Sequence, residues 1–563
     1  MSLIIRERPF DNDVVRNLVD SGISPILARI FAARGIESNE DVYESFSNLI
    51  PHFSMKNISL AAEMVTGAII RKEKIVILSD YDCDGATGCA LGHEALSKLG
   101  ADVEYFIPDR TTMGYGLSPE SIGALTKEYE PKWIITVDNG ISSVDGVRYA
   151  KDLGIGVIIT DHHLAGAKLP EADAIINPNQ PGCPFPSKYL SGVGVIFYFM
   201  LAIRQCMRDH NLLSVESQPN FANLLDLVAI GTIADMVPLD RNNRILVKEG
   251  MQRIRRGVAH PGVIALFQVA RKDHRKATTN DISFLIAPRI NAAGRISDMR
   301  VGIDCLIATS SASAYELAKS LNSMNNKRKI IEASMRDQAM SKLSELSSEK
   351  STVVLYDRKW HPGLVGLIAN RIKDATQLPT IAFSNCGNSI LRGSGRSISQ
   401  IHIKSVFDIV DKENPGMLLQ YGGHASAAGL TINELDLNNF TVAFEHAVNK
   451  EMENKVSHEE VLTDGSLDPC DINMKLIEDI ENTVWGKDFS EPLFCNKFEI
   501  QNIKVVQNKH LSFRLKHGSY SFPAFQWNRN NVPEVPGRAI YQLKSSRFGQ
   551  IGPALVISAW END

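Results

Sequence analysis

The 563-residue sequence has no long apolar run and no closely spaced pair of cysteines. A transmembrane helix needs about 18 consecutive apolar residues, and no such stretch occurs. The first residues, MSLIIRERPFDND, reach acidic side chains before any long apolar run, which argues against a signal peptide. The eight cysteines include no CxxC pair, which argues against a disulfide framework and a zinc site. We therefore expect reduced thiols and a cytoplasmic protein that does not associate with a membrane.

An overall excess of positive charge is also missing, because the formal net charge is −5. The charge is nevertheless segregated along the chain. Residues 251–300 hold ten Lys and Arg against three Asp and Glu, residues 501–550 hold eight against one, and residues 451–500 hold four against thirteen. An acidic chain can still bind a polyanion where its cations are concentrated. The balance of apolar (44%) and charged (22%) residues is that of a globular protein.

The length predicts several domains, and the residue pattern changes along the chain. Short β-branched runs alternate with helical segments from residue 75 to about 262, which is typical of βαβ units around a parallel sheet. A polar helical stretch, a smaller mixed α/β unit and a series of short strands typical of a β-barrel follow. The predicted parts are a helical appendage (1–55), a parallel-sheet α/β domain (56–309), a connecting helix (310–350), a mixed α/β domain (351–455) and a β-barrel (456–563).

Acidic residues or histidines follow three of the predicted strands. These groups are Asp80, Asp82 and Asp84 (after 75–78), Asp138 (after 133–137), and Asp161, His162 and His163 (after 157–160). The carboxyl ends of strands in an open parallel sheet line its binding crevice, so we expect these side chains to converge. Asp235, after another apolar stretch, adds a further carboxylate.

Such a cluster of carboxylates predicts bound cations, because like charges a few ångströms apart strongly disfavour joint ionisation. Oxygen ligands with one or two imidazoles suit Mg²⁺ or Mn²⁺, and histidine favours Mn²⁺. Two ions ~3.5–4 Å apart would activate a water for in-line attack on phosphorus. A single Asp at a strand end is more often a helix cap or turn residue, and Asp80 and Asp161 could orient ligands instead of binding metal. His163 could be a ligand or could donate to a substrate phosphate.

Four ordered segments, SDYDCDG, DNGI, TDHH and ADMVPL, resemble the motifs of the DHH phosphoesterase superfamily. More narrowly, five further segments are similar to segments of RecJ single-stranded-DNA exonucleases and occur in the same order. They are IPDRTTMGYGL, SFLIAPRINAAGR, KWHPGLVGLIANRI, RGSGRS and YGGHASAAGL. The resemblance implies a metal-dependent exonuclease of DNA recombination and repair, which acts from the 5′ end of single-stranded DNA and releases 5′-mononucleotides. It also implies that the mixed α/β unit is a DHH-associated domain and the barrel an oligonucleotide-binding (OB) domain.

The same resemblance assigns roles to individual residues. One ion would be held by Asp82, Asp138 and Asp235 with Asp80 nearby, and the second by Asp84, Asp138, His162 and Asp235, while His163 would face the scissile phosphate. Three further sets would contact DNA: His361, Gly422, Gly423 and His424 at the nucleotide being cut, Ser394, Arg396 and Arg110 at the 5′-phosphate, and Arg289, Asn291 and Arg295 along the backbone. His361 could instead be a turn residue, and the last set a helix cap with two surface charges.

The C-terminal segment interleaves aromatic rings with its basic excess, which suits the stacking of single-stranded bases. The seven rings are Phe513, Tyr520, Phe522, Phe525, Trp527, Tyr541 and Phe548, of which we expect half or more to be barrel core. The implied partners are single-stranded DNA, a single-stranded-DNA-binding protein and a helicase. The protein itself is expected to be a monomer. Two alternatives remain: a hydrolase of short oligonucleotides, cyclic dinucleotides or pyrophosphate, and a catalytically silent replication scaffold. The extra C-terminal domain and basic segments favour a polymer substrate, and the complete set of ligand residues disfavours a silent scaffold.

Overall fold

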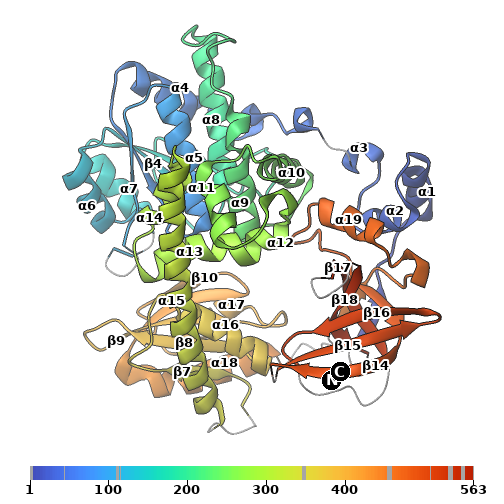
Figure 1. Ribbon diagram of the computed structural model, residues 1–563. Helices are drawn as coiled ribbons and strands as arrows, with labels where there is room; N and C mark the ends of the chain where they lie inside the picture. Colours follow the sequence, from blue (N-terminus) through green and yellow to red (C-terminus); the bar gives the residue numbers. More distant parts are fainter. Residues whose placement is uncertain are drawn as a thin grey trace.

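A computed structural model of the chain confirms the predicted α/β class (Figure 1). The structure describes residues 4–42, 45–109, 113–114, 116–344, 350–452, 460–507, 509–529, 537–546 and 552–561. Within these residues the strands form four sheets: a parallel sheet in the first half of the chain, a mixed sheet after a long helix, a C-terminal sheet and a small two-stranded sheet. No helix in the described ranges is long and apolar enough to cross a membrane.

The first large sheet has five parallel strands in the order β3-β2-β4-β5-β6. Their bounds are β2 Ile75–Ser79, β3 Val103–Phe106, β4 Trp133–Val137, β5 Gly156–Thr160 and β6 Ala174–Ile176. The two faces of the sheet lie in different cores: Ile77 and Ile135 pack into one core, and Val76 and Ile134 into the other. Burial on both faces explains why these strands are continuous apolar runs. The first four coincide closely with the predicted strands, whereas β6 was not predicted.

Helices cover both faces of this sheet (Figure 1). The helices on the first core are α4 Ile58–Ile70, α5 Cys83–Lys98, α8 Gly192–Asp209 and α9 Leu225–Asp235, and those on the second are α6 Pro119–Tyr129 and α7 Val144–Asp152. The helices that follow are α10 Arg241–Arg256, α11 Pro261–Val269, α12 Thr279–Asp281, α13 Ala287–Ile296 and α14 Arg300–Ile307. The apolar stretch before Asp235 is therefore a helix, in which residues 225–233 are buried.

A charged triad with a buried carboxylate, Asp226, holds three of these helices together. His260, at the start of α11, places Nδ1 2.8 Å from Asp226 Oδ2 of α9 and Nε2 2.9 Å from Glu94 Oε2 of α5. Burial alone would lower the pKa of His260, but the charge and hydrogen bond of Asp226, together with Glu94, outweigh it and raise the pKa to about 10. The imidazolium is thus the form that the folded protein stabilises.

Replacing His260 by alanine is expected to destabilise the protein at neutral pH, because Asp226 would remain buried without its cationic partner. Breaking a buried pair in this way costs about 3–5 kcal/mol. The folded pKa lies above the unfolded value of about 6.5, so the contribution is complete below pH ~6.5 and disappears as the pH rises towards 10. Thermal unfolding of both proteins across this range should show the difference shrinking with pH. The exposed pair His446–Glu413 offers the control: His446→Ala should change little. A difference that does not depend on pH would contradict the assignment.

A long helix, α15 Ser311–Ser344, leads from the parallel-sheet domain to the mixed sheet (Figure 1). That sheet has the order β10-β11-β9-β8-β7, in which only β7 and β8 pair in parallel. Its elements are β7 Val353–Tyr356, α16 Val365–Thr376, β8 Thr380–Asn385, β9 Ile390–Arg396, α17 Ile403–Glu413, β10 Gln420–Gly423, β11 Ala427–Asn433 and α18 Leu437–Met452.

The C-terminal domain packs against the N-terminal helices. Strand β12 (Glu460–Thr463) pairs in parallel with β1 (Ile4–Glu7), and the Arg34 guanidinium makes a buried ion pair with Asp464. The N-terminal segment, predicted as helical only, therefore also supplies a strand. The remaining elements are α1 Asn12–Asp20, α2 Pro25–Ala32, α3 Asn39–Val42, α19 Met474–Asn482, β13 Phe494–Lys497, β14 Glu499–Val506, β15 His510–His517, β16 Tyr520–Gln526, β17 Arg538–Ser545 and β18 Pro553–Trp560. The last six strands form one sheet in the order β13-β17-β18-β16-β15-β14.

Candidate metal centre and nucleic-acid interface

The loop after β2 places three carboxylates at the start of α5. Asp82 is the N-cap residue of this helix, and its Oδ1 accepts hydrogen bonds from the backbone N–H groups of Asp84 (2.9 Å) and Gly85 (3.1 Å). Asp80 Oδ1 accepts from the N–H of Tyr81 at 2.7 Å. The capping role expected of a single Asp is thus real for Asp82, but one of its carboxylate oxygens suffices for it.

Asp84 is buried against the N-terminus of α8. Its Oδ2 accepts from Gly192 N–H at 2.6 Å and its Oδ1 from Val193 N–H at 2.9 Å. A Cβ atom at residue 192 would lie 2.5 Å from Asp138 Cβ, so only glycine allows α8 to approach both carboxylates. Sequence reasoning missed Gly192, although the SGVG segment that opens a long apolar helix was a usable signal.

Asp138 and His162 lie in contact at the centre of the cluster. Asp138, directly after β4, has a left-handed backbone with φ of 63°. His162 Nε2 lies 3.0 Å from Asp138 Oδ1, 3.5 Å from Asp235 Oδ2 and 3.9 Å from Asp84 Oδ2. The carboxyl ends of β2, β4 and β5 therefore meet in one cluster, as the strand-end argument predicted, and the C-terminus of helix α9 adds Asp235 to it.

Asp161 orients the two histidines and is fully engaged in doing so. Its Oδ1 accepts from the N–H groups of His162 (2.7 Å) and His163 (3.1 Å), and its Oδ2 from Ile141 N–H (3.0 Å). His163 Nδ1 also lies 2.8 Å from Asp161 Oδ1. Burial would lower the pKa of His163, but this hydrogen bond and the charge of Asp161 raise it to about 9.

The cluster carries more buried negative charge than its protein surroundings compensate. Burial, and then the charge of Asp82, raises the pKa of Asp84 to about 7. The pKa values of Asp138 and Asp235 are raised well above their ordinary range by burial and by the charge of Asp84. Burial and the neighbouring His163 lower the pKa of His162 to about 4, so its ring is neutral. Its buried Nε2 makes no hydrogen bond within the described part of the chain.

This donor set fits hard divalent cations. Two groups of ligand atoms each lie within 4.8 Å of one another: one from Asp80, Asp82 and Asp138, the other from Asp84, His162 and Asp235. Asp138 also forms such a group with His162 and His163, which links the two. A neutral imidazole nitrogen among carboxylate oxygens is the mixture that Mn²⁺ and Mg²⁺ accept.

The mixed domain brings His424 to this centre. The His424 ring stacks on that of His163, with centroids 6.2 Å apart and an angle of 14° between the planes. His424 directly follows the exposed Gly422 and Gly423, the last residues of β10, and the φ of 143° at Gly423 favours glycine. His424, one of the predicted nucleotide-binding residues, therefore borders the metal-ligand cluster.

A second polar group lies at the N-terminus of α16. Arg396 Nη1 donates to Ser394 Oγ (3.0 Å) and to the carbonyl of Gly395 (2.8 Å). A Cβ atom at Gly366 in the first turn of α16 would lie 3.0 Å from Ser394 Oγ, so this glycine, which sequence reasoning missed, keeps the helix terminus close to both side chains. A helix N-terminus with a guanidinium and a hydroxyl suits a phosphate. Arg110 lies outside the described residues.

The remaining predicted residues are Arg289, Asn291 and Arg295 on α13, and His361 in the mixed domain. Arg289 is only 8% exposed, and its Nε donates to Asn322 Oδ1 at 3.0 Å, so its guanidinium is engaged within the protein. Arg295 Nη1 donates to Gly363 O at 3.4 Å, and Gly363 N–H donates to His361 Nδ1 at 3.1 Å. Asn291 Oδ1 is buried without a hydrogen-bond partner in the described part of the chain.

The arrangement of the carboxylate cluster and the sequence of the chain together define a DHH-type protein. Residues 74–232 match the DHH family, N-terminal domain; residues 349–450 match the DHHA1 domain; and residues 463–550 match the RecJ OB domain. The chain is 41% identical over 543 residues to the single-stranded-DNA-specific exonuclease RecJ of Escherichia coli strain K12, which covers 93% of this chain and 94% of the relative. It is 40% identical over 558 residues to the protein of the same name from Haemophilus influenzae, covering 96% of each. The chain belongs to the RecJ family, which confirms the motif resemblance.

Solved structures show the same architecture. RecJ from Thermus thermophilus in complex with Mn²⁺ superposes with a TM-score of 0.84 at 26% identity, covering 99% of this chain and 79% of that one. The complex of that protein with Mg²⁺ gives a TM-score of 0.78 at 25% identity, covering 99% and 78%. The two metals found in these relatives are the two that the donor set of this chain favours.

Proposed function

We propose that this chain is a 5′→3′ exonuclease specific for single-stranded DNA, which hydrolyses phosphodiester bonds and releases 5′-mononucleotides in DNA recombination and repair. The observation that carries the proposal is the stacking of His424 on His163, which sets the turn of a second domain against the carboxylate cluster. A substrate strand would pass between the two domains. The names of the curated relatives support the class of substrate.

The residues that would hold two divalent cations are Asp80, Asp82, Asp84, Asp138, His162 and Asp235. Such ions, when bound, polarise a phosphoryl oxygen and lower the pKa of a coordinated water. The contribution of the protein is orientation. Asp161 fixes the ring of His163 through Nδ1 and raises its pKa, so that Nε2–H would donate to an oxygen of the scissile phosphate. His424 and the glycine turn before it would bind the nucleotide that is removed.

Direction of cutting would follow from the phosphate-binding group at α16. Arg396, Ser394 and Arg110 would hold the terminal 5′-phosphate, while His361 and the α13 residues Asn291 and Arg295 would position the strand. Arg289 would act on the strand indirectly, by holding α13 to Asn322 of α15. Within this scheme residues 56–309 form the catalytic domain, and residues 310–350 connect it to the domain of residues 351–455, which binds the 5′ end. Residues 456–563 bind the strand further from that end, and residues 1–55 pack on this C-terminal domain. The boundary at residue 455 lies outside the described residues.

We also propose that the enzyme acts as a monomer in the cytoplasm, on single strands supplied by a helicase and coated by a single-stranded-DNA-binding protein. The test of function is degradation of labelled single and double strands, with each end blocked in turn. Loss of activity when only the 5′ end is blocked supports the proposal. A length series separates it from a hydrolase of short oligonucleotides, because that enzyme would prefer the shortest substrates, and a silent scaffold would cut none.

The C-terminal domain offers exposed aromatic rings for strand binding. Of the six predicted rings that the structure describes, Phe513, Phe522 and Tyr541 are buried, whereas Trp527 and Tyr520 are 57% and 46% exposed. Phe548 lies outside the described residues. Trp527 packs edge-on against Phe525, with centroids 4.3 Å apart, so its outer face is held ready for stacking.

Replacing Trp527 by alanine is expected to weaken binding of long single strands while leaving the rate on saturating short ones near wild type. Stacking of one base on an aromatic ring contributes about 1–3 kcal/mol, which corresponds to roughly 5- to 150-fold in affinity. Fluorescence anisotropy with labelled oligonucleotides of increasing length measures the effect. Leu462→Ala, which removes an exposed apolar side chain from β12 of the same domain, is the control. An equal loss of rate on short and long strands would contradict a role in strand binding.

A further inference from the structure

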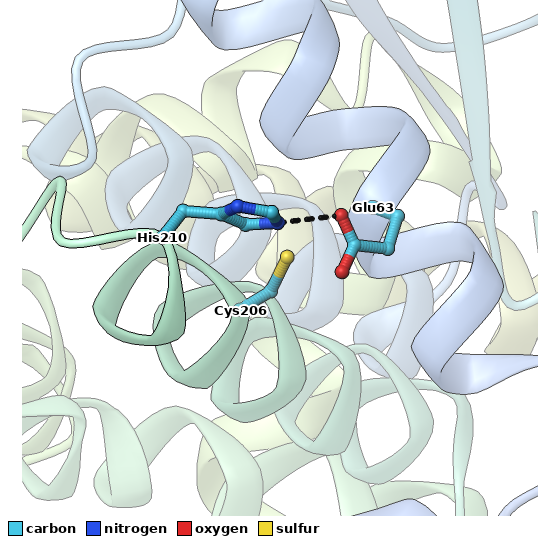
Figure 2. Close-up of side chains that lie close together, drawn as sticks. All are labelled: Glu63, Cys206 and His210. Carbon is cyan, nitrogen blue, oxygen red and sulfur yellow. Dashed lines mark hydrogen bonds and ion pairs between the residues drawn. The ribbon is translucent and has the colours of Figure 1, made fainter.

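Three potential metal ligands meet on the outer side of the parallel-sheet domain, on elements different from those that carry the carboxylate cluster. Glu63 lies on α4, Cys206 in the last turn of α8, and His210 directly after that helix (Figure 2). We propose that these residues form a second metal site, which binds a borderline-soft divalent cation of the Zn²⁺ type.

The side chains are already placed as a ligand set. His210 Nε2 lies 2.8 Å from Glu63 Oε2, and the Cys206 sulfur lies between the two groups in Figure 2. One ligand atom from each residue falls within 4.8 Å of the others. Cys206 and His210 are four residues apart, a spacing that places both side chains on one face of a helix.

The chemistry of this set differs from that of the first centre. Thiolate, imidazole and carboxylate together are typical ligands of Zn²⁺, whereas an oxygen-rich cluster suits Mn²⁺ and Mg²⁺. No other group of three ligands among the described residues includes a cysteine. The two sites would therefore select different metals.

Thr66 provides an independent observation at the sulfur. It lies one turn beyond Glu63 on α4 and is 2% exposed. Its hydroxyl lies beside the Cys206 thiol and makes no hydrogen bond among the described residues, while burial and the neighbouring Glu63 and Asp209 raise the pKa of that thiol, an effect that Thr66 offsets only in part. A cation bound to the sulfur would displace the thiol proton, and the resulting thiolate would give the unpartnered Thr66 hydroxyl an acceptor.

The exposure of the three side chains indicates how a cation would reach the site and what its binding would do. Glu63 and His210 are 59% and 51% exposed, while Cys206 is 7% exposed, so a cation would arrive from solvent and keep a water as its fourth ligand. Binding replaces the thiol proton and any proton shared by Glu63 and His210, and these protons pass to solvent. The bound ion would join α4 to α8, whose opposite end holds Asp84. It would stabilise the scaffold without taking part in hydrolysis.

Cobalt titration of the full-length protein tests the site, because Co²⁺ bound to a thiolate gives a near-ultraviolet charge-transfer absorption that carboxylate and imidazole ligands do not. At saturation we expect this absorption to correspond to one thiolate-bound Co²⁺ per chain, in addition to any Co²⁺ taken up by the carboxylate cluster. It should be displaced by Zn²⁺ and should persist in Asp138→Asn, which damages that cluster. It should be absent in Cys206→Ser and present in Cys470→Ser, whose cysteine is exposed.

His210→Gln is expected to fold normally, because this residue is at the surface. It should weaken Co²⁺ binding by about tenfold or more and remove the rise in melting temperature that Zn²⁺ causes in the Asp138→Asn background. No thiolate absorption in the wild-type protein, or the same absorption in Cys206→Ser, would overturn the proposal. So would unchanged Zn²⁺ stabilisation in His210→Gln.

Discussion

Replacing Asp138 by asparagine is expected to reduce nuclease activity by more than about a hundredfold, the upper range for losing only an outer partner of a metal ligand. Asp138 lies between both groups of potential ligands and 3.0 Å from His162 Nε2, so the substitution removes an oxygen anion from the middle of the centre. Asparagine is chosen because the φ of 63° is tolerated by Asn, whereas alanine would add backbone strain. Nucleotide release from labelled single strands at saturating Mn²⁺ measures the effect.

Stability measurements separate loss of chemistry from loss of structure. In the presence of a chelator, Asp138→Asn should melt no lower than the wild type, because one of several mutually repelling buried carboxylates has become neutral. Added Mn²⁺ should raise the melting temperature of the wild type much more than that of the variant. Asp173→Asn, which removes a carboxylate that bonds to Val157 at the start of β5, the opposite edge of the parallel sheet, should retain activity. Activity of Asp138→Asn within about tenfold of the wild type would exclude a bridging role.

Replacing Arg396 by alanine is expected to erase most of the preference for 5′-phosphorylated over 5′-hydroxyl strands. The guanidinium donates to Ser394 Oγ beside the first turn of α16, an arrangement suited to a terminal phosphate dianion. A hydrogen bond to a charged group contributes roughly 1.5–3 kcal/mol, which corresponds to about ten- to a hundredfold in the ratio of the two rates. Initial rates on the two substrates, at a temperature where the variant is folded, give this ratio.

Arg392 provides the matched control, because it lies four residues earlier on the same strand, β9. Arg392→Ala should leave the phosphate-to-hydroxyl ratio unchanged. Lower stability of Arg396→Ala with an unchanged ratio would show that Arg396 serves the fold instead of the 5′ end.

Much of the parallel-sheet domain and its centre could be predicted from the sequence. Runs such as IVIL and WIITV are too apolar for one-sided burial, and the acids directly after them must lie at the carboxyl edge of a parallel sheet. The prediction worked because strand identity and side-chain order are local properties of the chain. The prediction extended to the long helix, because the spacing of its apolar residues is also a local property. The four motifs added the identity of the family.

Other features depended on packing between distant segments. Asp235 belongs to a helix that is buried on all sides, so its apolar stretch had no period from which to distinguish helix from strand. The Gly192 contact with Asp138 exists only where α8 meets β4. Likewise, basic character alone did not reveal that Arg289 is buried and bonded to Asn322.

The sequence by itself therefore determined the class of protein, most strands of the parallel sheet and the composition of the carboxylate cluster, because these depend on residue type and short-range spacing. Tertiary structure alone decided that His424 stacks on His163, that Trp527 is exposed while Phe513 is buried, and that Glu63 meets Cys206 and His210. The two contacts join residues that are far apart in the chain. The exposed and buried aromatic residues are of the same chemical type, so the sequence does not distinguish them. These distances and exposures are set by how helices and domains pack, which no local pattern encodes.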